Sequence, residues 1–164
     1  MTLNIFRHGE TYQSKFNVVY GAEELTAEVL PEAVPTVERI GEYLKSVPTE
    51  ANFTSEYLRC RQTAEIIESV SGKKFQSTPL LNEFVAGQFS DLQDRGLKFL
   101  EMVEDKRFDQ VVVCTHGAVM ACLKHLVMEG DFLERDLFDY PATGVVWEIS
   151  KEGLTEKNFR GLGS

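Results

Sequence analysis

Two histidines, His8 and His116, each follow a run of apolar residues and each precede a glycine. The apolar runs, residues 3–6 and 110–115, predict buried strands, and an imidazole at the carboxyl end of such a strand lies where α/β sheets bind ligands. Arg7 directly precedes the first histidine and has a guanidinium suited to bidentate contact with phosphate, while an imidazole is a nucleophile toward phosphorus. The pattern indicates phosphoryl chemistry, although the first segment alone is equally compatible with a loop histidine beside a surface arginine.

Arg59 stands where a predicted strand passes into a predicted helix, within residues 55–64. Backbone N–H groups and the helix dipole favour an anion at such a position, so Arg59, in the first helical turn, is a second candidate for phosphate binding. Arg61 is better explained as a solvated charge on the helix surface. His116 lies between an apolar strand and an apolar helix, where an imidazole needs a polar partner, and a bound phosphate would supply one.

The order of the expected elements indicates the fold that positions these residues. Residues 10–30 have no regular periodicity and are expected to form a long functional loop. Strands that alternate with helices predict a three-layer α/β/α sandwich, with a mostly parallel central sheet and a C-terminal hairpin, in one domain that spans residues 1–164. The expected strands are residues 3–6, 51–55, 75–81, 110–115, 144–149 and 154–159, and the expected helices are residues 34–47, 60–70, 92–103 and 118–128.

The composition is that of a globular protein, with 164 residues of which 43% are hydrophobic and 26% are charged. It excludes an intrinsically disordered chain, a collagen-like repeat and a coiled coil. The net charge of −9 disfavours nucleic acid and anionic membrane surfaces as partners, so a phosphorylated partner requires a local cationic pocket. The first seven residues lack the basic start and apolar core of a signal peptide, and no stretch of about 18 apolar residues could span a bilayer, so we expect a cytoplasmic protein.

Other features of the sequence are expected to have structural roles. Cys60, Cys114 and Cys122 are odd in number and form no CxxC pair, which favours buried reduced thiols over disulfides or a zinc site. His125 lies nine positions after the second candidate histidine and is expected to be a surface or capping histidine. The acidic stretch at residues 129–139 is expected to be a solvated connection.

Taken together, the segments around His8, Arg59 and His116 resemble the histidine phosphatase superfamily, which includes cofactor-dependent phosphoglycerate mutase and many small phosphatases. The resemblance runs from residue 3 to about residue 128, and the motifs occur in the same order as in the family. The matching residues are Arg7, His8 and Gly9 with Glu10 and Thr11 for the first motif, Ser55, Arg59, Gln62, Thr63 and Ala64 for the second, and His116 with Gly117 for the third.

The resemblance implies a phosphatase mechanism without a metal or another cofactor. His8 would attack the phosphorus and form a phosphohistidine, which water later hydrolyses, while Arg7, Arg59 and His116 would surround the phosphoryl oxygens. In the family, a glutamate soon after a leucine and before a glycine-containing loop acts as general acid and base, and Glu83 matches that position. Glu10 remains the alternative acid.

The chain also departs from the family pattern. Many relatives have asparagine where this chain has Ser14, so a phosphate contact is assigned to Ser14 or, as a substitute, to Asn17. In relatives, Glu-Gly comes after the loop that contains the acid, here called the acid loop, whereas this chain has Ser90 and Asp91 there. Five side chains are candidates for the substrate mouth and are equally compatible with ordinary loop packing. They are Tyr12, Lys15, Tyr20, Phe84 and Arg95.

The short interval between Glu83 and His116 leaves little room for a cap over the substrate, and a mutase needs an enclosed site that excludes water. We therefore predict hydrolysis of a phosphomonoester, with a small phosphorylated metabolite or a phosphoprotein as the partner. A compact phosphohistidine or phosphoprotein phosphatase is one alternative, and a catalytically inactive phosphate-binding module is another. A metal hydrolase that uses both histidines is disfavoured because the flanking arginines would repel a cation.

Overall fold

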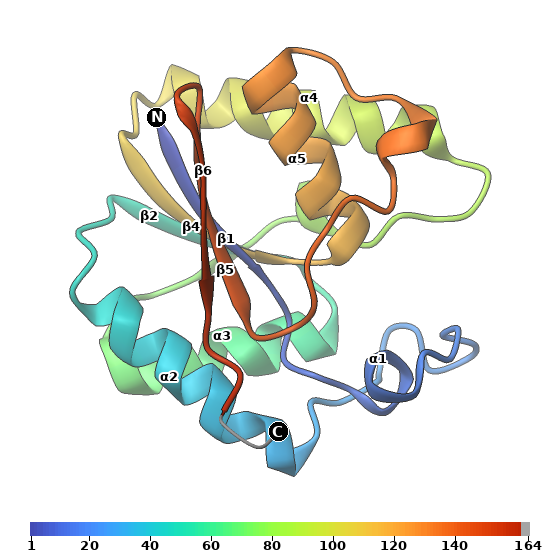
Figure 1. Ribbon diagram of the computed structural model, residues 1–164, viewed down its shortest axis with the longest axis vertical. Helices are drawn as coiled ribbons and strands as arrows, with labels where there is room; N and C mark the ends of the chain where they lie inside the picture. The colour runs from blue at the N-terminus through green and yellow to red at the C-terminus, as the bar shows by residue number, and fades with distance from the viewer. Residues whose placement is uncertain (162–164) are drawn as a thin grey trace.

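The computed structural model describes residues 1–161 and has six strands, which form one sheet. The strands are β1 (Thr2–Arg7), β2 (Ala51–Thr54), β3 (Gln76–Ser77), β4 (Gln110–Thr115), β5 (Val145–Ser150) and β6 (Gly153–Asn158). Their order across the sheet is β3-β2-β4-β1-β5-β6. Figure 1 shows the sheet between the helices and labels all of its strands except β3. The first four strands pair in parallel, and β5 and β6 form an antiparallel hairpin at one edge. The predicted mostly parallel sheet with a C-terminal hairpin is confirmed.

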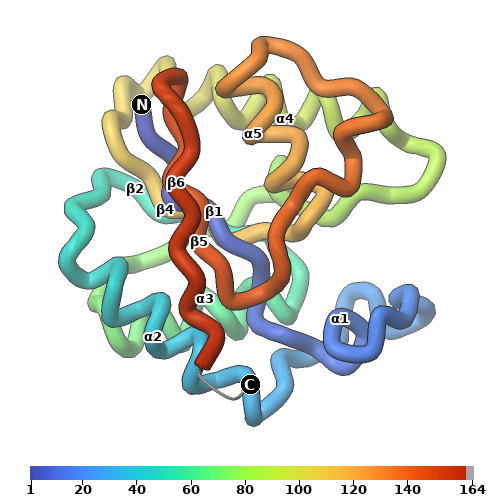
Figure 2. Tube along the Cα trace, in the orientation of Figure 1, coloured from blue at the N-terminus to red at the C-terminus, as the bar shows by residue number. Residues whose placement is uncertain are grey.

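Helices cover both faces of this sheet, as Figure 2 shows. The α-helices are α1 (Tyr12–Phe16), α2 (Val34–Lys45), α3 (Leu58–Ser71), α4 (Phe89–Asp105) and α5 (Gly117–Glu129), and the short 3-10 helices are η1 (Pro31–Ala33), η2 (Pro79–Leu81) and η3 (Glu134–Asp136). Side chains of β4 alternate between the two faces: Val111 and Val113 pack on the side of α4 and α5, and Val112 and Cys114 pack on the side of α2 and α3. The three-layer architecture is therefore confirmed.

The register of the two central strands positions the candidate histidines. In the parallel pair of β1 and β4, Phe6 lies opposite Cys114 and Arg7 lies opposite Thr115. Both strands are almost fully buried, which explains why they have continuous apolar runs rather than an alternating pattern. Because the paired strands end together, His8 and His116 leave the sheet side by side.

Two local expectations from the sequence are corrected by the structure. The strand expected at residues 75–81 is wrong for most of its length, because β3 has two residues and Pro79 begins η2. Proline has no N–H to donate to a neighbouring strand. The loop expected at residues 10–30 contains α1, whose first turn is capped by the side chain of Thr11. This helix has only five residues, too few to produce a readable apolar period.

Most residues of the segment after α5 are exposed, as expected for a solvated connection, but His125 is not a surface histidine. His125 is 7% exposed, its Nδ1 lies 3.0 Å from Glu129 Oε2, and its Nε2 lies 2.7 Å from Asp139 Oδ2. Phe132 is fully buried in the same segment. The acidic residues after α5 therefore fold back onto that helix, because they pair with a histidine that the helix presents.

The three cysteines are buried and free, as expected, within the part of the chain that the structure describes. Arg61 is exposed on α3, also as expected, and its Nε donates a hydrogen bond to the carbonyl oxygen of Glu56 at 2.9 Å. None of the helices within residues 1–161 is both long enough and apolar enough to cross a membrane.

Candidate active site

His8 and His116 lie at the carboxyl end of the sheet, with 5.5 Å between their ring centroids. Both rings are buried, with exposed fractions of 1% and 0% for the two residues. The backbone N–H of His8 donates to the carbonyl oxygen of Thr115 at 3.0 Å, so the two strand ends remain connected beyond the last sheet residues. The structure thus brings together the two histidines that stand more than one hundred positions apart in the sequence.

The tautomer of His8 follows from its hydrogen bond. His8 Nδ1 lies 2.8 Å from the carbonyl oxygen of Gly9, and a carbonyl oxygen only accepts, so Nδ1 has the proton and Nε2 has a free lone pair. Burial lowers the pKa of His8 well below its ordinary value, and the nearby charges of Arg7 and Arg59 lower it further. His8 is therefore neutral, which is the state in which an imidazole is nucleophilic.

Gly9 has a packing role that the sequence analysis did not anticipate. A Cβ atom at this position would lie 2.8 Å from a methyl group of Val29 and 2.9 Å from one of Val37. The backbone N–H of Gly9 donates to Thr63 Oγ1 at 2.8 Å, which connects the histidine loop to α3. The glycine thus permits close packing of the loop that holds His8 in place.

Arg59 is fully buried, and Glu24 engages its guanidinium twice. Nη1 donates to the carbonyl oxygen of Glu24, and Nη2 donates to the Glu24 carboxylate at 3.3 Å. The guanidinium also lies over the ring of Tyr20, at 3.9 Å from the ring centroid. Glu24 is therefore a site residue that the sequence analysis missed, and it occupies donors that an anion would need.

Arg7 reaches the same region from the end of β1. Its Nη1 donates to the carbonyl oxygen of Pro141 at 3.2 Å, and its guanidinium lies 5.2 Å from the centroid of the Tyr140 ring. The structure therefore holds Arg7 against the segment that precedes β5. This placement is consistent with its predicted role beside His8.

Three buried nitrogen atoms of the site have no hydrogen-bond partner among the described residues: Arg7 Nε, Arg59 Nε and His116 Nδ1. Burial of a polar group without a partner costs about 1–3 kcal/mol, so such groups are rare in native structures. All three belong to residues that the sequence analysis assigned to phosphate binding. An anion with several acceptor oxygens would accept from the two arginine Nε atoms, and from His116 Nδ1 when that nitrogen is protonated.

The orientation of His116 depends on a short hydrogen-bonded chain. Ser55 Oγ donates its proton to Asn82 Oδ1 at 3.1 Å, so at its 2.9 Å contact with His116 Nε2 it acts as the acceptor. Nε2 therefore has the proton, and Nδ1 faces the site. Burial lowers the pKa of His116 well below its ordinary value, and nearby positive charges lower it further. A bound anion would act in the opposite direction and favour a second proton at Nδ1.

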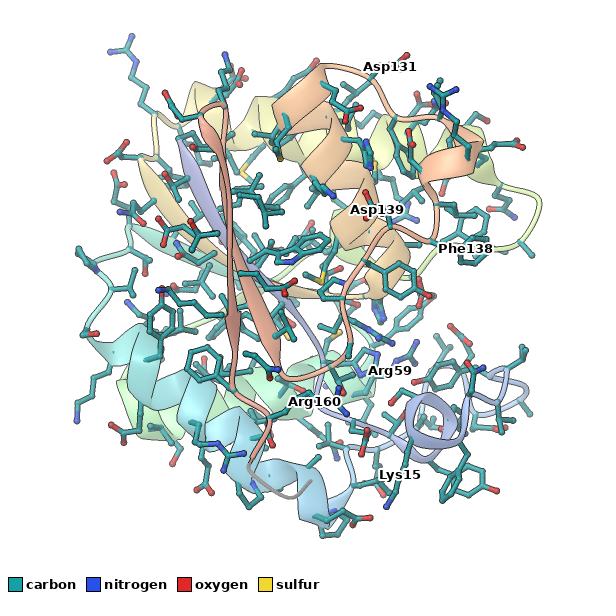
Figure 3. The ribbon with its side chains drawn as sticks, in the orientation of Figure 1. Lys15, Arg59, Asp131, Phe138, Asp139 and Arg160 are labelled. Carbon is teal, nitrogen blue, oxygen red and sulfur yellow. The ribbon has the colours of Figure 1, made fainter. Side chains whose placement is uncertain are left out.

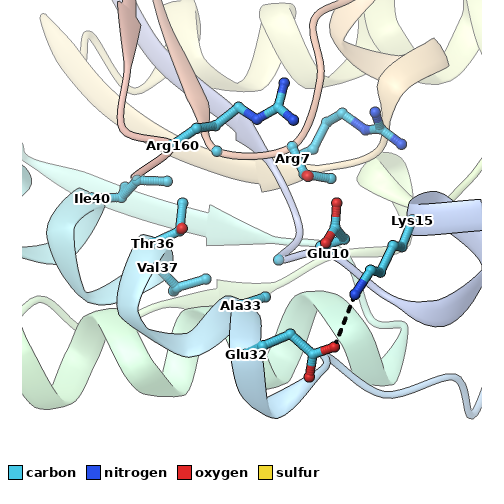
Figure 4. Close-up of a pocket in the computed structure, with 12 residues that line it drawn as sticks. Arg7, Glu10, Lys15, Glu32, Ala33, Thr36, Val37, Ile40 and Arg160 are labelled. Atoms are coloured by element: carbon cyan, nitrogen blue, oxygen red, sulfur yellow. Dashed lines mark hydrogen bonds and ion pairs between the residues drawn. The ribbon is translucent and has the colours of Figure 1, made fainter. Parts of the chain in front are cut away.

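Glu83 is the carboxylate that lies in the site. Its Oε2 lies 3.6 Å from His116 Nδ1 and 3.9 Å from Arg59 Nη2. Burial raises the pKa of the Glu83 carboxyl, and this effect outweighs the N–H of Phe84 and the charge of Arg59, which lower it. Glu10, the alternative acid, instead lines a neighbouring cavity (Figure 4). The geometry favours Glu83 over Glu10.

Arg95 does not line the substrate mouth, and its guanidinium instead binds the backbone of the acid loop. Its guanidinium donates to the carbonyl oxygens of Leu80 at 3.1 Å, Asn82 at 2.6 Å and Glu83 at 3.3 Å. Its Nε also pairs with Asp91 at 2.9 Å within α4. Arg95 is therefore a positioning residue for Glu83 and Asn82, because it fixes the backbone that presents both side chains.

A cleft of about 430 Å³ opens onto the site, and two of the predicted mouth residues, Tyr20 and Phe84, line it. The two residues predicted to contact phosphate, Ser14 and Asn17, also line it. The hydroxyl of Ser14 is engaged by Thr11, whose backbone N–H donates to it at 2.8 Å, whereas Asn17 is an exposed residue at the end of α1. The geometry therefore favours Asn17 over Ser14 for a contact with a ligand.

The remaining two mouth candidates lie outside this cleft. Tyr12 is 56% exposed and stacks against Phe16 with 4.9 Å between the ring centroids. Lys15 pairs with Glu32 at 3.3 Å and lines the neighbouring cavity of about 420 Å³, as Figure 4 shows. Tyr12 and Lys15 are therefore not brought to the candidate active site.

Asn82 is a second site residue that the sequence analysis missed. Its Oδ1 accepts from Ser55 Oγ and, at 2.9 Å, from the backbone N–H of Glu56, and its Nδ2 donates to Glu56 Oε1 at 3.0 Å. No periodicity indicates these contacts, but Asn82 directly precedes Glu83, and that adjacency was the one available signal.

Potential metal ligands gather elsewhere. Among the described residues, the one group of three side chains close enough to hold a metal ion is His125, Glu129 and Asp136. At about 1.5 Å of rise per residue, His125 lies roughly 14 Å along α5 from His116. Both of its ring nitrogens already contact carboxylates, so this group is described as an ion-pair cluster.

The fold and the site define an α/β protein with two buried histidines and two arginines at the carboxyl end of a mostly parallel sheet. Residues 3–93 match the family model of the histidine phosphatase superfamily, branch 1. Because the match covers more than half of the chain, the protein belongs to the histidine phosphatase superfamily. A search of curated protein sequences found no match.

Solved structures of the same fold include several phosphatases. The alpha-ribazole phosphatase from Shigella flexneri has a TM-score of 0.77 at 16% identity, and the match covers 96% of this chain and 95% of that chain. The protein histidine phosphatase SixA, complexed with tungstate, has a TM-score of 0.68 at 16% identity, with coverage of 96% and 94%. A mycobacterial glucosyl-3-phosphoglycerate phosphatase has a TM-score of 0.78 at 14% identity, with coverage of 95% and 96%. The α/β fold that the resemblance to the histidine phosphatase superfamily implies is confirmed.

Proposed function

We propose that this protein is a phosphatase that hydrolyses a phosphate monoester through a phosphohistidine on His8. The observation that carries this proposal is the 2.8 Å hydrogen bond from His8 Nδ1 to the carbonyl oxygen of Gly9, which leaves Nε2 unprotonated and able to attack phosphorus. The low pKa of the buried ring keeps it neutral. Membership of the histidine phosphatase superfamily supports the same chemistry.

In the first step, His8 Nε2 attacks the phosphorus in line with the bond that breaks. The N–P bond forms, the P–O bond to the leaving group breaks, and the leaving oxygen takes the proton of the Glu83 carboxyl. Arg7, Arg59 and the protonated Nδ1 of His116 bind the phosphoryl oxygens and stabilise the charge that they carry. The three unpartnered nitrogens of the site support this arrangement.

In the second step, the Glu83 carboxylate removes a proton from water, whose oxygen attacks the phosphorus of the phosphohistidine. The P–N bond breaks, His8 regains its lone pair, and inorganic phosphate leaves. Burial favours the neutral form of both His8 and Glu83, which makes one a nucleophile and the other an acid at the start of the cycle.

The charges of the site support catalysis by these side chains without a metal. The net charge of the chain is −9, but Arg7 and Arg59 provide fixed positive charge at the site. The site would therefore attract a small dianion. Phosphate would have to replace Glu24 as the partner of the Arg59 Nη groups. Turnover in the presence of a chelator is the expected outcome.

Hydrolysis is favoured over mutase activity because the acid loop is followed directly by α4 and β4, with no inserted cap, and the cleft opens at its mouth. The raised pKa of Glu83 favours an ester substrate over a phosphoramidate, because an ester oxygen leaves as an alkoxide unless an acid protonates it, whereas a phosphoramidate nitrogen is basic enough to be protonated before the P–N bond breaks. An inactive binding module would not require a nucleophile and an acid together. We propose a small phosphorylated metabolite as the partner, and the buried free cysteines support a reducing, cytoplasmic compartment.

The test is to incubate the protein with phosphate monoesters in chelator, quench at short times, and look for an acid-labile phosphoenzyme. We expect the His8→Asn variant to form none and to lose at least 10³-fold in turnover, on the order expected for removal of a nucleophile. His125→Asn is the matched control, because it removes a buried histidine that lies outside the site. Full turnover by His8→Asn would overturn the proposal.

A further inference from the structure

One wall of the cleft beside the candidate active site is largely apolar. Three separate segments contribute apolar side chains to it: the residues after α1, the acid loop, and the segment between η3 and β5. These side chains are Val18, Val19, Phe84, Leu137, Phe138 and Tyr140. A leaving group attached to a phosphate at His8 would lie in this cleft, because the cleft is bounded by Arg7, Glu83 and Gly117 of the site itself.

Several of these side chains are exposed to solvent. Val19 is 88% exposed, Phe138 is 78% exposed and Val18 is 47% exposed. Figure 3 shows Phe138 on the segment that follows α5, on the side of the molecule where α1 lies. These three side chains belong to neither hydrophobic core cluster, whereas Phe84, Leu137 and Tyr140 also pack against the core. Exposed apolar side chains at the mouth of a cleft are typical of a surface that a ligand covers.

The charges in the cleft indicate what such a ligand lacks. Arg7 is the only lysine or arginine among the described residues that line the cleft, and its guanidinium is held beside the phosphate position by Pro141 and Tyr140. Two carboxylates, Glu24 and Glu83, line the same cleft. A second anionic group on the substrate would therefore find no free cation and would face negative charge.

We infer that the substrate is a monoester with a single phosphate, whose leaving group is uncharged and aromatic or similarly apolar. This inference rests on the proposed function. The ring or apolar portion packs between the residues after α1 and Phe138, while its ester oxygen takes the proton of Glu83. The volume of about 430 Å³ is at the small end of the range of ligand sites, which suits a leaving group of one or two rings.

The test compares three aryl phosphates whose leaving groups have similar acidity: phenyl phosphate, 2-naphthyl phosphate and 4-carboxyphenyl phosphate. Because leaving-group acidity is matched, differences in kcat/KM report contacts in the cleft. We expect 2-naphthyl phosphate to exceed phenyl phosphate by about 5-fold, from the added apolar area. We expect 4-carboxyphenyl phosphate to fall below phenyl phosphate by about 10-fold, from repulsion by the Glu24 carboxylate and from the lack of a free cation in the cleft.

A variant locates the preference. Phe138→Ser removes an exposed ring from the cleft wall and is expected to raise KM for both esters, but more for 2-naphthyl phosphate, so that the advantage of the larger ring is lost. Leu97→Ser is the matched control, because Leu97 is 47% exposed on α4 and does not line the cleft. The control is expected to keep the wild-type preference.

The outcomes distinguish an error in the substrate class from an error in the phosphatase proposal. Equal kcat/KM for the three esters, or a preference for 4-carboxyphenyl phosphate, would overturn the substrate class and leave the phosphatase proposal standing. An unchanged naphthyl preference in Phe138→Ser would also overturn it. Absence of turnover with all three esters, and with simple alkyl phosphates, would refute the phosphatase proposal itself.

Discussion

The contact between Glu24 and Arg59 leads to a prediction about phosphate affinity. Glu24 presents both its carbonyl oxygen and its carboxylate to the Arg59 guanidinium, so a phosphate that binds Arg59 must displace an anion that the chain itself supplies. The Glu24→Gln variant keeps an acceptor oxygen in the same place but removes the charge. We therefore expect this variant to bind inorganic phosphate more tightly than the wild type.

The magnitude follows from the geometry. At an effective dielectric constant of about 20, two unit charges 3.3 Å apart attract by roughly 5 kcal/mol. The Glu24 side chain is 33% exposed and the glutamine retains a hydrogen bond, so only part of this attraction opposes phosphate. We expect a gain of about 1.4 kcal/mol, which is roughly a 10-fold decrease in the dissociation constant.

The assay is isothermal titration with inorganic phosphate, together with its inhibition constant against a monoester substrate. Glu23→Gln is the matched control, because Glu23 adjoins Glu24 and undergoes the same charge change, but its carboxylate accepts from Gln13 at 3.0 Å instead of contacting Arg59. If Glu24→Gln weakened phosphate binding, Glu24 would be positioning Arg59 and the competition argument would be wrong. An equal gain in Glu23→Gln would assign the effect to net charge alone.

Three further predictions concern the acid, its support and the ion-pair cluster. Glu83→Gln should slow alkyl phosphates by about 10²-fold or more in kcat but slow 4-nitrophenyl phosphate far less, and equal losses would contradict the acid assignment. Arg95→Met should lower kcat by about 10-fold for alkyl phosphates and less for 4-nitrophenyl phosphate, because the backbone of Glu83 loses a hydrogen bond that holds it in place. Rescue by Arg95→Lys would support a role in positioning Glu83. An equal loss for both kinds of ester would indicate a merely structural role. For His125, burial lowers the pKa, but the hydrogen bonds to Glu129 and Asp139, together with the charge of Asp136, outweigh burial and leave the pKa raised. The contribution of His125 to the free energy of unfolding is therefore complete below the ordinary pKa of 6.5 and is lost as pH rises through the raised pKa. Denaturant unfolding should show that His125→Gln is destabilising in acid and nearly neutral at alkaline pH. A loss of stability that does not depend on pH would refute this reasoning.

The sequence alone was sufficient for the two central strands and for the histidines that follow them. The apolar runs at residues 3–6 and 110–115 are local signals of buried strands, and parallel strands must end at the same edge of a sheet. The sequence therefore placed His8 and His116 at the same edge of the sheet, and the pairing of β1 with β4 brings them side by side. Arg59 was found in the same way, because it follows a strand in the first turn of α3.

Other parts of the structure were hidden from the sequence because their signals are weak or absent. α1 is too short for a period, and β3 has two residues before Pro79 interrupts the strand. His125 was misassigned because a lone histidine on an apolar helix says nothing about the carboxylates that a later segment folds against it.

Only the tertiary structure shows which carboxylates and supporting side chains lie in the candidate site. Glu83 rather than Glu10 lies beside His116, Arg95 supports the acid loop, and Glu24 engages Arg59. These contacts join loops and helices that are far apart in the chain, and loop geometry has no sequence period. Local hydrophobic patterns therefore determined the sheet and the residues at the ends of its strands, and only long-range packing of loops determined the electrostatics around them.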